Sequence, residues 1–295
     1  MRLAFTSDLH TDSHSANRCV WQEMVAMLHD IQPDIFICCG DIAADAQQLG
    51  ISLFALESLP CPKLLVPGNH DIWVRNKNWL KKGVTSRHKH DNLLPALCHA
   101  AGFHPLWIEP FLFGNIAFCG SMGWYDYSLR NHAFDAHFSL QDYRRKGFQS
   151  YQWNDRRFVH WHRPGENGTS PTQIRDEVLA ADLANKLTQQ LQYAQQHASR
   201  IIAVTHMLPF RAMMVYHQEP QRDYFGAFMG SVLLGEAIQS CPQVELVLSG
   251  HTHRKQTVQV GHITAHTSPL GYARQWQNQT PRDIARERLS IIEIG

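Results

Sequence analysis

Five short runs of apolar residues along the chain predict β-strands. The first three runs are separated by segments 16–31 and 44–59, in which apolar residues recur every three or four positions, as in helices. Strands that alternate with helices in this way predict a parallel sheet with right-handed crossovers. The predicted strands are 2–7, 34–39, 63–67, 200–205 and 244–249.

The middle of the chain has a weaker pattern. Residues 125–167 are rich in Arg, His, Trp, Tyr and Asp without a clear period, which favours a cap or long insertion over a separate domain. Gly114-Asn115 separates two apolar runs and predicts a hairpin. A helix is predicted over roughly 172–197, capped by Thr172 or Ser170 and with Pro171 suited to its first turn. Further helices are predicted at 93–101 and 230–240, and closing strands at 257–260, 263–267 and 289–294.

A polar cluster follows each of the five predicted strands. In open α/β sheets, strand ends assemble one site from distant parts of the sequence. The side chains are Asp, His and Asn without cysteine, a mixture that suits borderline-to-hard divalent ions such as Mn, Fe, Zn or Co. The clusters are Asp8-Leu9-His10, Gly40-Asp41, Gly68-Asn69-His70-Asp71, His206 and Gly250-His251-Thr252-His253.

The spacing within the clusters is compatible with a shared site. Residues i and i+2 of an extended segment point the same way, so Asp8 and His10 are expected to face one ion. His251 and His253 have the same spacing. Glycine tolerates positive φ and close backbone approach, which sharp turns at strand ends require, and it precedes two of the clusters, at Gly68 and Gly250.

In content and order, these clusters resemble the signature of the calcineurin-like metallophosphoesterases. That signature runs Asp-x-His, Gly-Asp, Gly-Asn-His-Asp/Glu, a lone His and Gly-His-x-His, and it is complete here between Asp8 and His253. The resemblance implies an α/β fold of two packed mixed β-sheets between helical layers, a four-layer sandwich with a cap insertion. Residues 1–295 would form a single domain, with insertion or cap segments inside 75–168.

The resemblance also implies a centre of two divalent ions (Mn, Fe or Zn) bridged by Asp41. His70 would not bind metal; it would act as general acid to the leaving oxygen or stabilise charge there. Asp71 would orient His70 or a neighbouring group. One ion would be held by Asp8, His10, Asp41 and His253, and the other by Asp41, Asn69, His206 and His251.

These residue types suit phosphate-ester hydrolysis. Two ions roughly 3.5–4 Å apart neutralise phosphoryl oxygens and lower the pKa of a bridging water, which yields a hydroxide for in-line attack. Asp8 and Asp41 are the two carboxylates of the predicted ligand set, so the centre keeps a net positive charge that attracts anions. The expected substrate is a small phosphodiester, because the insertion offers aromatic and basic residues without an obvious cluster for a dianionic terminal phosphate.

Three other functions remain open. A phosphomonoesterase would use the same centre. A nuclease would need a broad basic groove, and the balance of 27 Lys+Arg against 26 Asp+Glu speaks against nucleic acid as a partner. A non-catalytic protein-binding scaffold would be expected to have lost ligands or His70, and the sequence retains them all.

Contacts with the substrate are less clear from sequence. Trp124 and Tyr125 are candidate stacking residues, although packing within the cap explains them too. Arg254 follows the last predicted ligand and is a candidate phosphate contact or carboxylate partner. The basic run 81–90 is either a solvated face or a phosphate contact.

Cysteine usage and hydropathy indicate the compartment. The seven cysteines include no C-x-x-C pair, and several lie in predicted strands, so reduced buried thiols are expected rather than a Zn–thiolate site. No apolar stretch reaches transmembrane length, and the first predicted strand leads directly into Asp8, unlike a secretory signal. The sequence therefore predicts a cytoplasmic protein without a membrane partner and leaves the oligomeric state unknown.

Overall fold

The computed structural model describes residues 1–163, 172–276 and 279–295, and most of its strands form two large sheets. Both sheets are mixed, with parallel strands inside and antiparallel strands at one or both edges. The order in the first is β15 (Ser290–Glu293), β1 (Arg2–Thr6), β2 (Ile35–Cys38), β3 (Lys63–Leu65), β4 (Phe103–Pro105). The order in the second is β13 (Gln256–Val260), β14 (Ile263–Thr267), β12 (Val244–Ser249), β11 (Arg200–Thr205), β6 (Ile116–Ser121), β5 (Phe111–Phe113).

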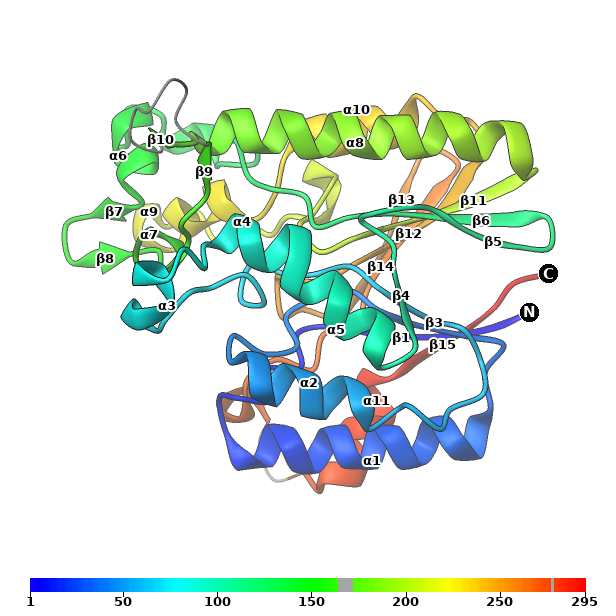
Figure 1. Ribbon diagram of the computed structural model, residues 1–295. Coiled ribbons are helices and arrows are strands. Elements are labelled where there is room, and N and C mark those ends of the chain that lie inside the picture. Colours follow the sequence, from blue (N-terminus) through cyan, green and yellow to red (C-terminus); the bar gives the residue numbers. More distant parts are fainter. Residues whose placement is uncertain (164–171, 277–278) are drawn as a thin grey trace.

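Helices cover the two outer faces, which completes the predicted four layers (Figure 1). On the side of the first sheet lie α1 (Ser15–Ile31), α2 (Ala46–Phe54) and α11 (Pro281–Arg288), and α5 (Leu94–Ala100) packs beside β4. On the side of the second sheet, α8 (Asp176–His197) packs on β6 and β11, and α10 (Val232–Gln239) packs against α8.

Each central strand contributes to two cores. In β1, Leu3 and Phe5 pack between the sheets, whereas Ala4 faces the helical side. In β2, Ile37 likewise packs between the sheets and Phe36 faces the helical side. Because strand side chains alternate between faces, strands that are buried on both faces read as continuous apolar runs. That pattern is the one that predicted these strands.

The predicted elements agree with the structure in type, and two helices differ in extent. Strands 200–205 and 244–249 are confirmed at both ends. The helix predicted over 44–59 is shorter, since Asp45 caps it by accepting a hydrogen bond from the backbone of Gln48 and residues 55–58 form turns. The helix predicted over 172–197 begins at Asp176, because Thr172 belongs to the short strand β10 (Thr172–Gln173). Ser170 and Pro171 lie outside the described residues.

Short elements gather at one end of the molecule and form the cap (Figure 1). The range 75–168 also supplies β4, β5 and β6 to the sheets, so only part of it belongs to the cap, and two short elements that follow residue 168 belong to the cap as well. The hairpin at Gly114-Asn115 joins β5 to β6, as predicted. The cap contains α3 (Lys77–Lys81), α4 (Ser86–His88), α6 (Leu140–Arg145), β7 (Gly147–Phe148), β8 (Tyr151–Gln152), α7 (Asp155–Phe158), β9 (His162–Arg163), β10 and α9 (Pro220–Asp223).

Two further expectations concern the cysteines, which were predicted to be reduced and buried, and a membrane-spanning segment, which was not predicted. All seven cysteines are free, and five of them are buried. Across the described residues, no helix has both the length and the apolar character needed to cross a bilayer.

Candidate dinuclear metal centre

Loops that follow β1, β2 and β3 of the first sheet and β11 and β12 of the second bring the seven predicted ligands together at the carboxyl ends of these strands. Asp41 lies in the middle of them. Its Oδ2 is 3.8 Å from Nε2 of His10, and its Oδ1 is 3.5 Å from Nε2 of His206. One carboxylate therefore presents an oxygen to each of two groups of ligand-type atoms.

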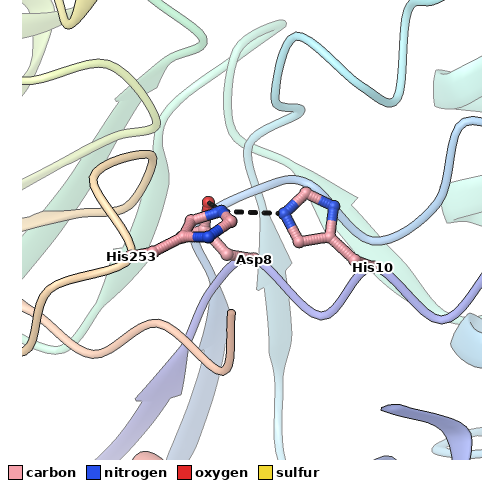
Figure 2. Close-up of side chains that lie close together, drawn as sticks. All are labelled: Asp8, His10 and His253. Carbon is pink, nitrogen blue, oxygen red and sulfur yellow. Dashed lines mark hydrogen bonds and ion pairs between the residues drawn. The ribbon is translucent and has the colours of Figure 1, made fainter. Parts of the chain in front are cut away.

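The first group consists of Asp8, His10 and His253 (Figure 2). Nε2 of His10 lies 2.9 Å from Nε2 of His253, which in turn lies 3.4 Å from Oδ1 of Asp8. Asp8 is held by the hydroxyl of Ser7 and by the backbone N–H of His251, which both donate to it. Two nitrogens and one carboxylate oxygen thus converge on one point beside Asp41.

The second group consists of Asn69, His206 and His251. Nε2 of His206 lies 3.2 Å from Oδ1 of Asn69 and 3.2 Å from Nδ1 of His251. All three side chains are buried. This group reaches the other oxygen of Asp41 through His206.

The hydrogen bonds of the histidine rings show which ring nitrogens are free to bind a cation. Nδ1 of His206 donates to the carbonyl of Cys39, and Nε2 of His251 donates to the carbonyl of Phe228, so each ring turns an unprotonated nitrogen towards the other. Two such lone pairs 3.2 Å apart have no hydrogen to share, and a cation between them satisfies both. His253 donates similarly to Oε1 of Gln275, which leaves its Nε2 facing His10.

The pKa shifts agree with a cation site. Burial and the neighbouring histidines lower the pKa of His251 to about 3, and burial also lowers the pKa of His10 and His206, so these rings are neutral ligands. Burial, followed by the charges of Asp8 and Asp71, raises the pKa of Asp41. Carboxylates crowded in this way need positive charge beside them, which divalent ions supply.

The backbone of the predicted ligands is not extended, which corrects the expectation drawn from their spacing. Five of the residues have positive φ: +53° at Asp8, +44° at His10, +58° at Asp41, +73° at His251 and +52° at His253. Side chains with Asp and His chemistry tolerate this left-handed region better than most, and such strain concentrates at functional sites. Each pair therefore converges through a tight turn at the strand end.

Gly68 and Gly250 are required for close approach, as expected, and not for positive φ, which corrects the other half of the prediction. A Cβ at Gly68 would lie 2.1 Å from Oδ1 of Asp41, and a Cβ at Gly250 would lie 2.8 Å from Oδ2 of Asp8. Neither glycine is among the residues with positive φ. Both let a neighbouring loop approach a carboxylate closely.

Gly68→Ala is expected to lower metal affinity at least ~10-fold, because Asp41 must move away from the new methyl group. Gly50→Ala is the matched control: it lies within α2, and its Cβ would meet only Leu97 at 3.8 Å. The control should keep its metal and gain about 0.5–1 kcal/mol of stability. Metal content after gel filtration and thermal melting test both; equal metal content in the two variants would contradict the prediction.

Asp71 supports the backbone of the Asp41 loop. Its carboxylate accepts hydrogen bonds from the backbone N–H groups of Asp41, Ile42, Ala43 and Gly68, at 2.7–3.0 Å. Burial raises its pKa to about 6, against the effect of these bonds. It therefore orients a neighbouring segment, which is one of the two roles expected for it, and it forms no hydrogen bond with His70.

His70 lies at the edge of the centre with its side chain 14% exposed. Its Nε2 is 3.9 Å from Oδ2 of Asp41, and its ring stacks on Trp73 with 3.6 Å between centroids. Burial, His10 and Arg75 lower its pKa. A neutral imidazole still carries one N–H, so His70 is placed to donate a hydrogen bond to an oxygen bound beside Asp41.

Asp155, in α7 of the cap, is a site residue that the sequence did not reveal. It is buried and accepts hydrogen bonds from Nδ2 of Asn69 at 3.0 Å, from the indole of Trp73 at 2.6 Å and from the indole of Trp153 at 2.8 Å. The bond to Nδ2 turns the amide oxygen of Asn69 towards His206. No motif marks Asp155, since it lies 86 residues after Asn69 in a segment without periodicity.

Asp155→Asn is expected to weaken the binding of one metal by ~10–100-fold, the usual effect of losing a residue that orients a ligand. The amide that replaces the carboxylate no longer forces Asn69 to present oxygen. Asp176→Asn is the control, because Asp176 is also buried and binds Trp124, Tyr127 and Lys146 but contacts no predicted ligand. Both variants should lose stability. Calorimetric metal titration should show the affinity loss in Asp155→Asn alone, and a similar loss in both would argue against this role.

A cleft of about 440 Å³ opens beside the centre. The predicted stacking residues do not line it: Trp124 and Tyr125 are fully buried, and their polar atoms donate to Asp176 and Asp155. This is a correction, because side chains without exposed surface pack the cap and cannot touch a substrate. The cleft is lined by Asp41, His70, Trp73, Gln152, Trp153, Asn154, Phe225, Met229, His251, Thr252, His253, Tyr272, Arg274 and Gln275.

Comparison with known proteins agrees with this geometry. The sequence profile described as calcineurin-like phosphoesterase matches residues 1–255. The chain belongs to the calcineurin-like phosphoesterase family. Membership makes it a metal-dependent phosphoesterase, and the clustered His and Asp side chains are the metal site that such an enzyme needs. No curated protein sequence matches the chain.

Solved structures share the fold. Phosphopantetheinyl hydrolase from Mycobacterium tuberculosis is similar with a TM-score of 0.70 and 19% identity, covering 98% of this chain and 95% of that one. A dimetal phosphatase from Danio rerio is similar with a TM-score of 0.50 and 13% identity, covering 90% and 86%. Both confirm the two-sheet α/β architecture of this member of the calcineurin-like phosphoesterase family.

Proposed function

We propose that the seven predicted ligands hold two divalent ions, Mn, Fe or Zn, and that the enzyme hydrolyses a small phosphodiester. The observation that supports the metal assignment is Asp41, whose two oxygens face two separate groups of nitrogen and oxygen atoms. Asp8, His10, Asp41 and His253 would hold one ion, and Asp41, Asn69, His206 and His251 would hold the other.

The charge of the cleft supports a diester over a monoester. Arg274 is the sole Arg or Lys among the described residues that line it, beside the aromatic rings of Trp73, Trp153 and Tyr272. A phosphodiester carries one negative charge and two organic groups, which this lining accommodates. The name of one structural neighbour points to the same class, since a phosphopantetheinyl group joined to a second oxygen is a phosphodiester.

Residues of the chain assist the departure of the leaving group and shield the centre from solvent. When bound, the two ions neutralise phosphoryl oxygens and lower the pKa of a coordinated water. His70 donates a hydrogen bond to the leaving oxygen, and Trp73 holds its ring in position. Tyr272 stacks on His10 at 4.4 Å between centroids and shields that side of the centre from solvent.

The test compares 4-nitrophenyl phosphate with bis(4-nitrophenyl) phosphate on protein loaded with Mn²⁺, Fe²⁺ or Zn²⁺. A higher kcat/KM for the diester is the expected result. A higher kcat/KM for the monoester would assign a phosphomonoesterase, which also fits the centre. No turnover of either ester with two metals bound would refute the proposal, and salt-sensitive cleavage of DNA or RNA would identify a nuclease.

We also propose that the enzyme works in the cytoplasm. The support is its seven free cysteines, five of them buried, which suit a reducing compartment.

A further inference from the structure

A second cavity, of about 450 Å³, adjoins the metal cleft. The two share three wall residues, Phe225, Met229 and Thr252, so they are neighbouring parts of one depression. Thr252 lies between the predicted ligands His251 and His253. The second cavity therefore begins next to the metal centre and leads away from it.

The segment that forms this cavity is anchored to the metal centre. The carbonyl of Phe228 accepts the hydrogen bond from His251, so the 3-10 turn Tyr224–Phe228 is fixed relative to a predicted ligand. The 3-10 turn Arg211–Met213 is held by Gln256 of β13, which donates to the carbonyl of Met213. Both walls are thus positioned by the second sheet, through His251 directly after β12 and Gln256 in β13.

The lining of the cavity is mainly apolar and adaptable. It contains Met213, Met214, Val215, Phe225 and Met229. Methionine is flexible and polarizable, so such walls adapt to apolar groups of different shape. Val215 is 43% exposed, so a ligand in the cavity can reach its side chain.

The charged groups of the cavity select against cations. Arg254 and Arg222 both line it, so Arg254, a predicted substrate contact, lies in this cavity rather than in the metal cleft. The Asp223 carboxylate is already satisfied by Nδ2 of Asn131 and by the backbone N–H groups of His217 and Gln218. Arg222 pairs with Glu219 at 3.7 Å, whereas Arg254 forms no ion pair among the described residues, so a cationic group in the cavity would face Arg254 beside an apolar surface.

We propose that this second cavity, which we call the arm subsite, binds the retained organic arm of the phosphodiester and takes an apolar arm without positive charge. The inference rests on the proposed function, because it needs a phosphate with two organic groups. With the phosphate at the metals, the shared wall of Phe225, Met229 and Thr252 directs one arm into the subsite.

Three diesters with one common leaving group test the arm subsite. Methyl, 3-phenylpropyl and choline esters of 4-nitrophenyl phosphate release the same nitrophenolate and differ only in the retained arm. On the Mn²⁺-loaded enzyme, we expect kcat/KM for the phenylpropyl ester to exceed that for the methyl ester at least ~10-fold, as apolar pockets discriminate added methylenes. The choline ester should be no better than the methyl ester.

Val215→Asp places a carboxylate in the subsite and should bring the phenylpropyl-to-methyl ratio close to one. Leu112→Asp is the matched control, since Leu112 is similarly exposed, at 41%, but lies on β5. The control should keep the wild-type ratio. Equal kcat/KM for the two esters in the wild type, or an unchanged ratio in Val215→Asp, would overturn the inference.

A binding measurement separates this inference from the proposed function. Methyl 3-phenylpropyl phosphate lacks a good leaving group, and calorimetry on the Mn²⁺-loaded protein measures its binding without turnover. Binding that is lost in Val215→Asp and kept in Leu112→Asp supports the arm subsite even if no diester is hydrolysed. Binding that is absent in the wild type, or equal in both variants, refutes it whatever the activity.

Discussion

Asp41→Ala is expected to remove the metals and with them the activity. Asp41 offers one oxygen to each ligand group, so its loss takes a ligand from both ions at once. Loss of a residue that merely orients a ligand weakens metal binding ~10–100-fold, and loss of a shared ligand should exceed that range. Elemental analysis after gel filtration should fall from two metals per chain towards none, and turnover of bis(4-nitrophenyl) phosphate should fall with it.

Asp12→Ala controls for removing a nearby carboxylate. Asp12 accepts hydrogen bonds from the backbone of Ala44 and Asp45 and pairs with Arg75 at 3.1 Å, but it belongs to neither ligand group. This variant should keep two metals and nearly full turnover. If Asp41→Ala also kept two metals, the bridging role of Asp41 would be wrong.

His70→Asn is expected to lower kcat by about 10²–10⁴-fold while the metals remain, which is the usual contribution of a residue that assists proton transfer. The effect should depend on the leaving group. Nitrophenolate needs little assistance, whereas an alkoxide needs a proton or a hydrogen bond as it departs. We therefore expect a larger loss of kcat with an alkoxide leaving group than with nitrophenolate. The two losses are measured on two methyl phosphodiesters, one that releases nitrophenolate and one that releases an alkoxide.

Two outcomes would contradict this role of His70. Loss of one metal in His70→Asn would place His70 among the ligands. This alternative has a structural basis, because the ligand-type atoms of His10, Asp41 and His70 lie within 4.8 Å of one another. Equal losses of kcat for both leaving groups would show that His70 does not assist the departure of the leaving group. His99→Asn, on the exposed surface of α5, controls for the substitution itself and should match the wild type.

The strands and the metal centre were predictable because both leave local traces in the sequence. A strand buried on two faces needs an unbroken apolar run, as in 200–205 and 244–249. Each polar cluster directly follows such a run, so parallel pairing brings the first three clusters together at one end of the first sheet and the last two at one end of the second. The cap left no comparable trace: its elements are two to six residues long and too short for a hydrophobic period.

The sequence by itself determined the fold class, the order of the clusters and the set of side chains that meet at the centre. The tertiary structure alone decided how those side chains are held. Positive φ at Asp8 and His10, the space left by Gly68, and the hydrogen bond from Asn69 to Asp155 all depend on contacts between segments far apart in the chain. Local patterns cannot encode such contacts, because each requires a partner whose distance in space is set only when both sheets and the cap have packed.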